Sequence, residues 1–193
     1  MTKRKFSVST DGVSSCISLL NKDECEAVRD WAIRHSQSMP GHTHSSQEAS
    51  QTPLRRCREY VIDPVAISFS DGSTLESRIV KAFNMGNVWN LEYSDIPSIR
   101  VMEYQVGDGY GRHVDWSSGA AQNRKISMTV QLSDPEFYKG GEVTLYPGPE
   151  SQDISSRQGD ATMWPSWTLH EVKPVIHGIR YSLTTWAHGR PFK

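Results

Sequence analysis

The segment IRVMEYQVGDGYGRHVD, residues 99–115, decides the fold that we expect for this chain. Its first eight residues are rich in β-branched and aromatic side chains and predict a strand. Glycines at positions 107, 109 and 111 then interrupt that pattern, and a new strand is expected to begin at His113. Residues i and i+2 of a strand face the same side, so His113 and Asp115 are predicted to point together.

Short strands with regular punctuation continue to the end of the chain. Glycine and proline clusters separate five further strand-like runs, at residues 126–132, 142–146, 161–164, 169–172 and 181–187. Many short strands at regular spacing are typical of a barrel or sandwich. We therefore expect a mainly β (α+β) fold with a double-stranded β-helix, the jelly-roll or cupin-like core.

The first half of the sequence instead predicts helices and polar loops. Asn21 can cap a helix that runs to about His35, and Ser73 to Glu76 matches the capping box of a second helix. The apolar stripe expected on the second helix consists of Leu75, Ile79, Phe83 and Val88. Residues 36–53 are polar and show no periodicity, which predicts a long loop. We expect a single domain over residues 1–193, in which residues 1–97 form an outer layer and 98–190 the barrel.

Composition excludes several classes of function. With 193 residues, 36% hydrophobic and 22% charged, the chain is ordinary for one globular domain, and a net charge of −1 offers no global field for nucleic acid or an anionic membrane. Cys16, Cys25 and Cys57 form no C-x-x-C pair, which argues against zinc knuckles and thioredoxin-type chemistry. No apolar run is long enough for a signal peptide or a membrane span. The expectation is a soluble, cytoplasmic protein.

A third metal ligand must come from elsewhere in the chain, because His113 and Asp115 do not complete a site. His170 is the best candidate, since it lies in a strand-like run 55 positions after Asp115. Two imidazoles and one carboxylate on one face form the facial triad of non-haem Fe(II) oxygenases, which leaves the opposite face open.

Arg180 follows His170 by ten positions. If residues 174–178 turn as a hairpin, Arg180 is expected opposite His170. A planar guanidinium beside the metal suits a ligand carboxylate, such as the distal carboxylate of 2-oxoglutarate. Ser182 shares a strand face with Arg180, and Tyr104 lies on the preceding strand, so both are candidates to contact the same ligand.

The second half resembles the catalytic barrel of the prolyl 4-hydroxylase superfamily of Fe(II)/2-oxoglutarate dioxygenases. The resemblance rests on three ordered blocks: residues 104–115, residues 132–142 and residues 170–180, with Trp186 beyond them. The middle block is similar to a segment of bacterial prolyl/lysyl-hydroxylase-type members. Together the blocks cover residues 99–187, about half of the chain, and their order is more specific than any one motif.

The resemblance implies cofactors and an activity. His113, Asp115 and His170 would bind Fe(II), and Arg180 would bind 2-oxoglutarate, with dioxygen as the oxidant and ascorbate as an auxiliary reductant. The reaction would hydroxylate an unactivated C–H bond, of a prolyl or other residue in a peptide or protein, and release succinate and CO2. Some prolyl hydroxylases carry a tyrosine where Val130 is expected here, so Tyr104, Ser182 and Thr184 are the replacements that we expect to contact 2-oxoglutarate.

The substrate is not readable from these motifs. Tyr110, Trp116, Trp167 and Arg55 are candidate substrate contacts, and the loops at 36–58 and 116–124 are candidate entrance loops. A small molecule remains an alternative to a protein or peptide, and nucleic acid is not expected. Two other readings stay open: a jelly-roll metal enzyme that does not use 2-oxoglutarate, and a non-catalytic binding module on a degenerate barrel. The sequence predicts no oligomeric state.

Overall fold

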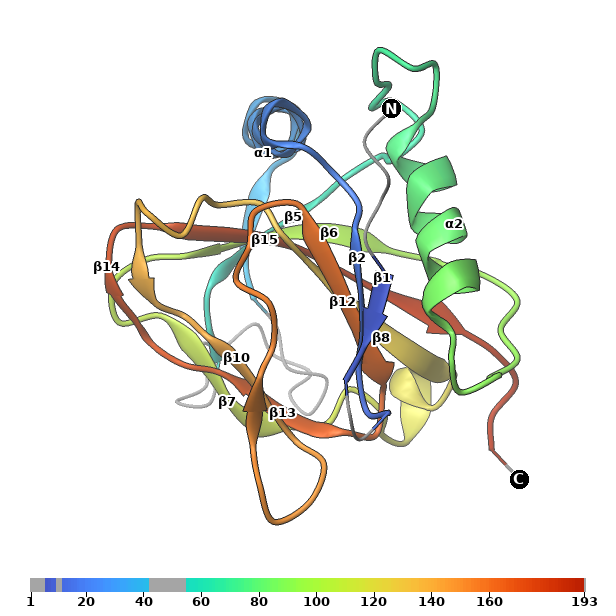
Figure 1. The fold of residues 1–193 in the computed structure, drawn as a ribbon. Coiled ribbons are helices and arrows are strands. Elements are labelled where there is room, and N and C mark those ends of the chain that lie inside the picture. The colour runs from blue at the N-terminus through green and yellow to red at the C-terminus, as the bar shows by residue number, and fades with distance from the viewer. Residues whose placement is uncertain (1–5, 10–11, 42–54, 193) are drawn as a thin grey trace.

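The computed structural model describes residues 6–9, 12–41 and 55–192, which form two α-helices, one short 3-10 helix and fifteen strands (Figure 1). The helices are α1 (Lys22–His35) and α2 (Leu75–Gly86), and the 3-10 helix η1 spans Gly119–Ala121. The strands are β1 (Phe6–Val8), β2 (Ser15–Ser18), β3 (Ser38–Pro40), β4 (Arg55–Arg56), β5 (Arg58–Val61), β6 (Ile99–Tyr104), β7 (Gly109–His113), β8 (Arg124–Gln131), β9 (Lys139–Gly140), β10 (Val143–Tyr146), β11 (Gln152–Asp153), β12 (Asp160–Pro165), β13 (Leu169–Val172), β14 (Val175–His177) and β15 (Arg180–His188).

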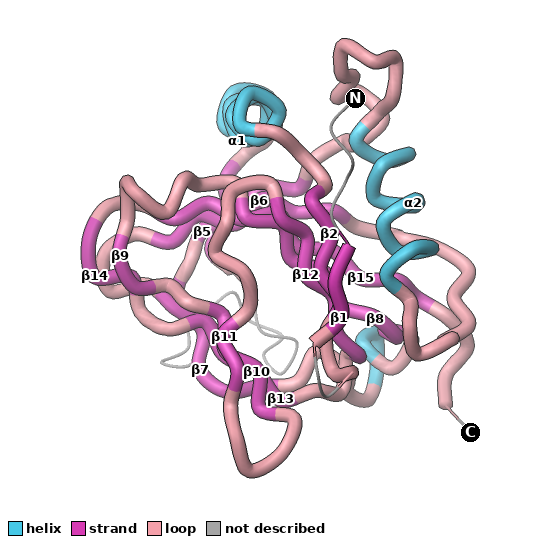
Figure 2. Tube along the Cα trace, viewed as in Figure 1, coloured by secondary structure: helices cyan, strands magenta, loops and turns pink. Residues whose placement is uncertain are grey.

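Two antiparallel sheets face each other and make the jelly-roll core that the sequence predicted. The larger sheet has eight strands in the order β1-β2-β12-β8-β15-β6-β5-β3, and the smaller has five in the order β11-β10-β13-β7-β4. A two-stranded sheet of β14 and β9 closes one end, where Figure 2 shows both strands beside the sheets. Some consecutive strands alternate between the two sheets, as β6, β7 and β8 do and as β11, β12 and β13 do.

Both helices lie outside the barrel and cover the larger sheet (Figure 1). Their buried side chains, among them Val28 of α1 and Ile79 and Phe83 of α2, belong to one hydrophobic cluster with Val101 and Met128 of the sheet. All five side chains are fully buried, so this helical layer, rather than the barrel interior, contains most of the apolar core. The helical layer expected outside the barrel is confirmed.

Side-chain alternation along the larger sheet separates this core from the barrel interior. On β15, Leu183 and Ala187 belong to the cluster under the helices, whereas Arg180, Ser182 and Trp186 line a cavity between the sheets. Strands β6 and β8 alternate in the same way, with Arg100, Met102, Tyr104 and Thr129 on the cavity side. Each of these strands therefore builds the core with one face and the candidate site with the other.

The first half of the chain is richer in strands than its sequence suggested. Strands β1, β2, β3, β4 and β5 all come from it, and β3 begins at Ser38 within the stretch that we expected to be loop. Short strands at the ends of sheets are difficult to predict because pairing with distant segments, and not local pattern, stabilises them. The rest of that loop, residues 42–54, lies outside the described residues, so its role as an entrance loop stays a prediction.

The two helices agree with the capping signals, with one shift. Asn21 caps α1 and exchanges hydrogen bonds with Glu24 in a capping box. For α2 the cap is Thr74, which pairs with Ser77, and not Ser73, the position that we expected. Val88 was assigned to the apolar stripe of α2, but it lies beyond the helix end and is exposed.

The described residues contain no helix that is long and apolar enough to cross a membrane.

Gly159 provides a test of how the N-terminal segment docks on the barrel. It has a φ of +85°, its carbonyl accepts hydrogen bonds from the amides of Leu19 and Leu20, and a β-carbon would collide with the carbonyl oxygen of Leu20. Gly159→Ala should lower the free energy of unfolding by about 1–3 kcal/mol, because it adds a left-handed backbone penalty to a steric clash. Chemical denaturation measures this change. Gly148→Ala is the control, since its β-carbon would meet nothing within 4 Å; equal stability of the two variants would contradict the account.

Candidate metal centre

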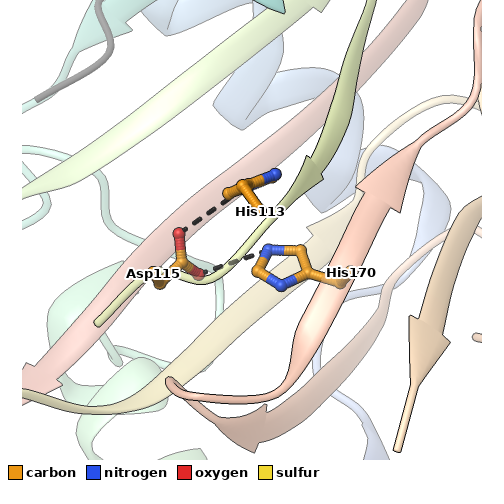
Figure 3. A group of neighbouring side chains, drawn as sticks. All are labelled: His113, Asp115 and His170. Atoms are coloured by element: carbon orange, nitrogen blue, oxygen red, sulfur yellow. Dashed lines mark ion pairs between the residues drawn. The ribbon is translucent and has the colours of Figure 1, made fainter. Parts of the chain in front are cut away.

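Three predicted ligands converge from two neighbouring strands of the smaller sheet and from the turn that follows one of them (Figure 3). His113 ends β7, His170 lies in β13, and the two residues are directly paired across the sheet. The Nε2 atoms of His113 and His170 lie 3.7 and 3.5 Å from the Asp115 carboxylate oxygens, and all three ligand groups fall within 4.8 Å of one another. Donors that each bind one ion at about 2.1 Å lie up to about 4 Å apart, so these spacings suit a shared metal.

Asp115 reaches the site from a turn and not from a strand. The structure ends β7 at His113, whereas we expected a strand to begin there. The backbone amides of Asp115 and Trp116 both donate to the carbonyl oxygen of Ser166 at 2.9 Å, which ties this turn to the segment before β13. Strand β7 starts at Gly109, before the expected position, where the missing side chain allows the chain to pack closely against β13. A β-carbon at Gly109 would lie 2.8 Å from the carbonyl oxygen of Val172.

Both histidines are oriented for coordination through Nε2. The Nδ1 atom of His113 lies 2.8 Å from the carbonyl oxygen of Gly111, and that of His170 lies 2.9 Å from the carbonyl oxygen of Thr168. A carbonyl can only accept, so each Nδ1 carries the proton and each Nε2 keeps a lone pair for a metal. Backbone atoms thus select the tautomer of both rings.

The surroundings of His113 and Asp115 keep these two side chains in the protonation states that bind a metal. Burial, reinforced by the neighbouring His170, lowers the pKa of His113 to about 4, so its imidazole is neutral at physiological pH. Burial alone would raise the pKa of Asp115, but His170, His113 and Arg124, together with the hydrogen bond from Ser127, bring it down to about 2. A neutral imidazole at His113 and an ionised carboxylate at Asp115 are the forms that coordinate a divalent ion.

Two residues of β8 fix the Asp115 carboxylate. The Ser127 hydroxyl donates to Oδ2 at 2.7 Å, and Nη1 of Arg124 lies 3.8 Å from Oδ1. Arg124 also stacks on the indole of Trp186, with its guanidinium carbon 3.8 Å from the ring centroid. Neither residue was predicted from the sequence, because a serine or arginine in a strand gives no signal until the sheet pairing is known.

Arg180 lines the same cavity as the three ligands, but it arrives there by a different route from the one expected. No hairpin places it opposite His170: β15 belongs to the larger sheet, where Arg180 pairs with Tyr104, and His170 belongs to the smaller sheet. The intervening β14 instead pairs with β9. Arg180 and the ligands meet because the two sheets face each other across the cavity.

Arg180 is a buried cation with no acidic partner among the residues that the structure describes. It is 2% exposed; Nη2 donates to the Gln131 side-chain oxygen at 2.8 Å, and Nη1 lies 3.4 Å from the Ser182 hydroxyl. Its Nε finds no partner within the described part of the chain. Burying a guanidinium without a counter-charge is costly, so this position favours an anionic ligand.

The remaining predicted site residues divide into two groups. Tyr104, Ser182, Thr184, Tyr110 and Arg55 all line the cavity. The ring of Tyr110 stacks on His113 at 3.5 Å between centroids, and the Arg55 guanidinium lies 5.0 Å above the Tyr110 ring. Trp116 and Trp167 lie elsewhere, in a partly exposed aromatic cluster with Phe192.

The position assigned to Val130 needs a correction. Val130 is fully buried in the cluster beneath the helices, so it does not face the ligand site. Its neighbours face the other way: Thr129 lines the cavity, and Gln131 contacts Arg180 directly. A one-residue error in strand register exchanges the two faces, which is why the sequence comparison selected the wrong side chain.

Comparison with known families supports this geometry. Residues 99–188 match the model of the 2OG-Fe(II) oxygenase superfamily. This segment belongs to that superfamily. The matched range contains all three candidate ligands and Arg180, together with strands β6 to β15.

The relatives that resemble this chain include bacterial PKHD-type hydroxylases. One from Synechococcus sp. (strain CC9902) is 37% identical over 143 residues, which cover 74% of this chain and 58% of that protein. Another, from Maricaulis maris (strain MCS10), is 32% identical over 116 residues, 58% of this chain and 52% of that protein. The chain therefore spans only part of the length of these relatives.

Solved structures share the fold. A Pseudomonas putida prolyl-4-hydroxylase superposes with a TM-score of 0.67 at 21% identity, covering 91% of this chain and 92% of that one. A Trichoplax adhaerens prolyl hydroxylase in complex with a hypoxia inducible factor peptide fragment gives 0.70 at 19% identity, covering 91% and 83%. At these identities the likeness establishes the jelly-roll architecture.

The superfamily uses Fe(II), 2-oxoglutarate and dioxygen, and the residues present fit these groups. Two imidazoles with free Nε2 atoms and one carboxylate are the donor set of a facial Fe(II) site. The buried Arg180, without a described acidic partner, suits the distal carboxylate of 2-oxoglutarate.

Ser127 tests whether the surroundings of Asp115 tune the metal site. Ser127→Ala should weaken Fe(II) affinity by about 10- to 100-fold, because Asp115 loses the hydrogen bond that orients its carboxylate. Competition with a metal-responsive chelator under anaerobic conditions measures the affinity. Ser118→Ala, at an exposed position on the neighbouring turn, should bind the metal as the unmodified chain does. Unchanged affinity in Ser127→Ala would show that Asp115 needs no such support.

Proposed function

We propose that this chain is an Fe(II)- and 2-oxoglutarate-dependent dioxygenase that hydroxylates an unactivated C–H bond of a peptide or protein, with a prolyl residue as the favoured target. The observation that carries the proposal is the sharing of one cavity by the His113–Asp115–His170 cluster and a buried arginine without a described acidic partner. The three ligands suit Fe(II), and the buried arginine, Arg180, suits the distal carboxylate of 2-oxoglutarate. A metal enzyme that did not use 2-oxoglutarate would have no need of that arginine.

Each side chain has a defined task in this reaction. His113, Asp115 and His170 hold Fe(II) from one side and leave the opposite side open to ligands. Arg180 binds the distal carboxylate of 2-oxoglutarate, and the Ser182 hydroxyl, 3.4 Å from Nη1 of Arg180, adds a donor beside it. When bound, Fe(II) with 2-oxoglutarate and dioxygen supplies the oxidant for C–H hydroxylation, and succinate and CO2 are the co-products.

The cavity walls explain how solvent is kept from the reaction. Trp164 contacts His170 edge-on at 5.1 Å between ring centroids, and both residues are almost fully buried. The ring of Tyr110 stacks on His113, and Met102 adds an apolar surface to the cavity wall. Exclusion of water strengthens the electrostatic interactions at the site and protects a reactive oxidant from side reactions.

A peptide substrate is supported by the comparisons, and two side chains at one edge of the smaller sheet are our candidates to contact it. One structural neighbour was solved with a peptide fragment bound, and two neighbours are prolyl hydroxylases. Arg55 and Tyr110 line the cavity where β4 pairs with β7, at one edge of the smaller sheet, so we propose that they contact the substrate. The auxiliary role of ascorbate remains part of this proposal.

The visible spectrum tests the proposed co-substrate. The protein reconstituted anaerobically with Fe(II) should develop a weak metal-to-ligand charge-transfer band when 2-oxoglutarate is added. The band should be absent in His113→Ala, which removes a metal ligand, and much weaker in Arg180→Ala, which removes the carboxylate partner. Bound metal without a band would support a metal enzyme that does not use 2-oxoglutarate, and neither metal nor band would support a binding module.

Mass spectrometry tests the proposed substrate class. Proline-containing peptides incubated with Fe(II), 2-oxoglutarate and air should gain one oxygen atom on a prolyl residue, with succinate formed in equal amount. Matched peptides with alanine in place of proline are the controls. Oxygen gained equally by the alanine peptides, or on a residue other than proline, would overturn the prolyl assignment and leave the hydroxylase class intact.

A further inference from the structure

Arg180 lies at one end of the cavity, and it is the first of three buried side chains that are joined by hydrogen bonds. Nη2 of Arg180 donates to Oε1 of Gln131 at 2.8 Å, and Nε2 of Gln131 donates to the phenol oxygen of Tyr138. Gln131 is 4% exposed and Tyr138 7%. Arginine can only donate, so the Gln131 amide must turn its oxygen to Arg180 and its NH2 group to Tyr138. Tyr138 thereby fixes the orientation of the amide that holds the guanidinium.

The segment after Tyr138 packs against the same arginine. Gly141 has a φ of +69°, and a β-carbon there would lie 2.7 Å from Cδ of Arg180 and 3.1 Å from a methyl group of Val175. Only glycine allows the chain to pass this close to the arginine stem in that backbone conformation. The Tyr138-Lys-Gly-Gly141 segment is part of the middle block of the resemblance. It packs against the stem of Arg180 through Gly141 and supports Gln131 through Tyr138.

A second cavity begins beyond this chain. Arg180 and Val143 line both cavities and so separate them, whereas Gln131, Tyr138, Gly141 and Ser155 line the second one. The described residues therefore leave a space behind Arg180 unfilled. Four contacts with described residues hold Arg180 between the two spaces: its bond to Gln131, its contact with Ser182, the Tyr104 ring 5.4 Å from its guanidinium carbon, and the backbone at Gly141.

We propose that Gln131 and Tyr138 are positioning residues that fix the depth of the 2-oxoglutarate pocket and thereby its preference for 2-oxoglutarate over longer 2-oxo diacids. The inference rests on the proposed function. Gln131 holds the guanidinium at one distance from the metal ligands, and Tyr138 holds Gln131. Without this chain, Arg180 can retreat towards the second cavity, and a diacid longer by one methylene then fits between metal and guanidinium.

Calorimetric titration of the Mn(II)-loaded protein, without turnover, tests the proposal. The ligands are 2-oxoglutarate and 2-oxoadipate, its homologue with one more methylene. Tyr138→Phe should weaken 2-oxoglutarate binding about tenfold, because the buried Gln131 amide loses its partner. Gln131→Leu should weaken 2-oxoglutarate binding further. It should also lower the 2-oxoadipate dissociation constant, relative to that of 2-oxoglutarate, by about tenfold. Mn(II) affinity should stay unchanged in both variants, since neither residue touches the metal ligands.

Two further variants sharpen the result. Gln131→Glu keeps the shape of the side chain but places a carboxylate on Arg180, so it should fold, bind Mn(II) and lose 2-oxoglutarate binding. Tyr146→Phe is the matched control: it removes a phenol that bonds Glu171 in the smaller sheet, and it should behave as the unmodified chain does.

The outcomes separate this inference from the proposed function. If the unmodified protein binds Mn(II) but not 2-oxoglutarate, the proposed function fails and this inference fails with it. If it binds 2-oxoglutarate in preference to 2-oxoadipate, and Tyr138→Phe and Gln131→Leu keep both the affinity and that preference, only this inference is wrong. A loss of affinity with an unchanged ratio would also overturn it, since depth would then not be what these residues control.

Discussion

The alternation of side chains along β6, β8 and β15 is the constraint on which the rest of the structure depends. One face of these strands forms the hydrophobic core under α1 and α2, and the other face lines the cavity. The helical layer supplies much of the apolar burial, so the barrel interior can carry polar groups that would otherwise weaken the fold. Arg180 and Ser127 are buried in this interior, although Ser127 is next to the core residue Met128 and Arg180 is three residues from Leu183.

The metal ligands and Arg180 were predictable because their chemistry is specified by residue type and order. His113, Asp115 and His170 form a donor set that few other functions require, and the structure brings them together. Six strands and both helices were also predicted within a few residues of their observed limits. Periodicity is a local property of the sequence, so it survives without knowledge of the tertiary fold.

What the sequence could not provide depends on pairing between distant segments. The relation of Arg180 to His170 was attributed to a hairpin, whereas it arises from two sheets that face each other. Val130 was placed in the site although its neighbour Gln131 faces Arg180, because strand register is fixed by partners and not by the strand itself. Ser127 and Tyr138 were not identified as site residues, since a hydroxyl becomes informative only when its acceptor or donor is known.

A crystal grown without oxygen, in the presence of Fe(II) and 2-oxoglutarate, would test the central claim most directly. The account predicts one anomalous peak at the iron edge, bound by Nε2 of His113, Nε2 of His170 and the Asp115 carboxylate, with a 2-oxoglutarate carboxylate on Arg180. Iron bound elsewhere or through Nδ1, or 2-oxoglutarate bound away from Arg180, would contradict it.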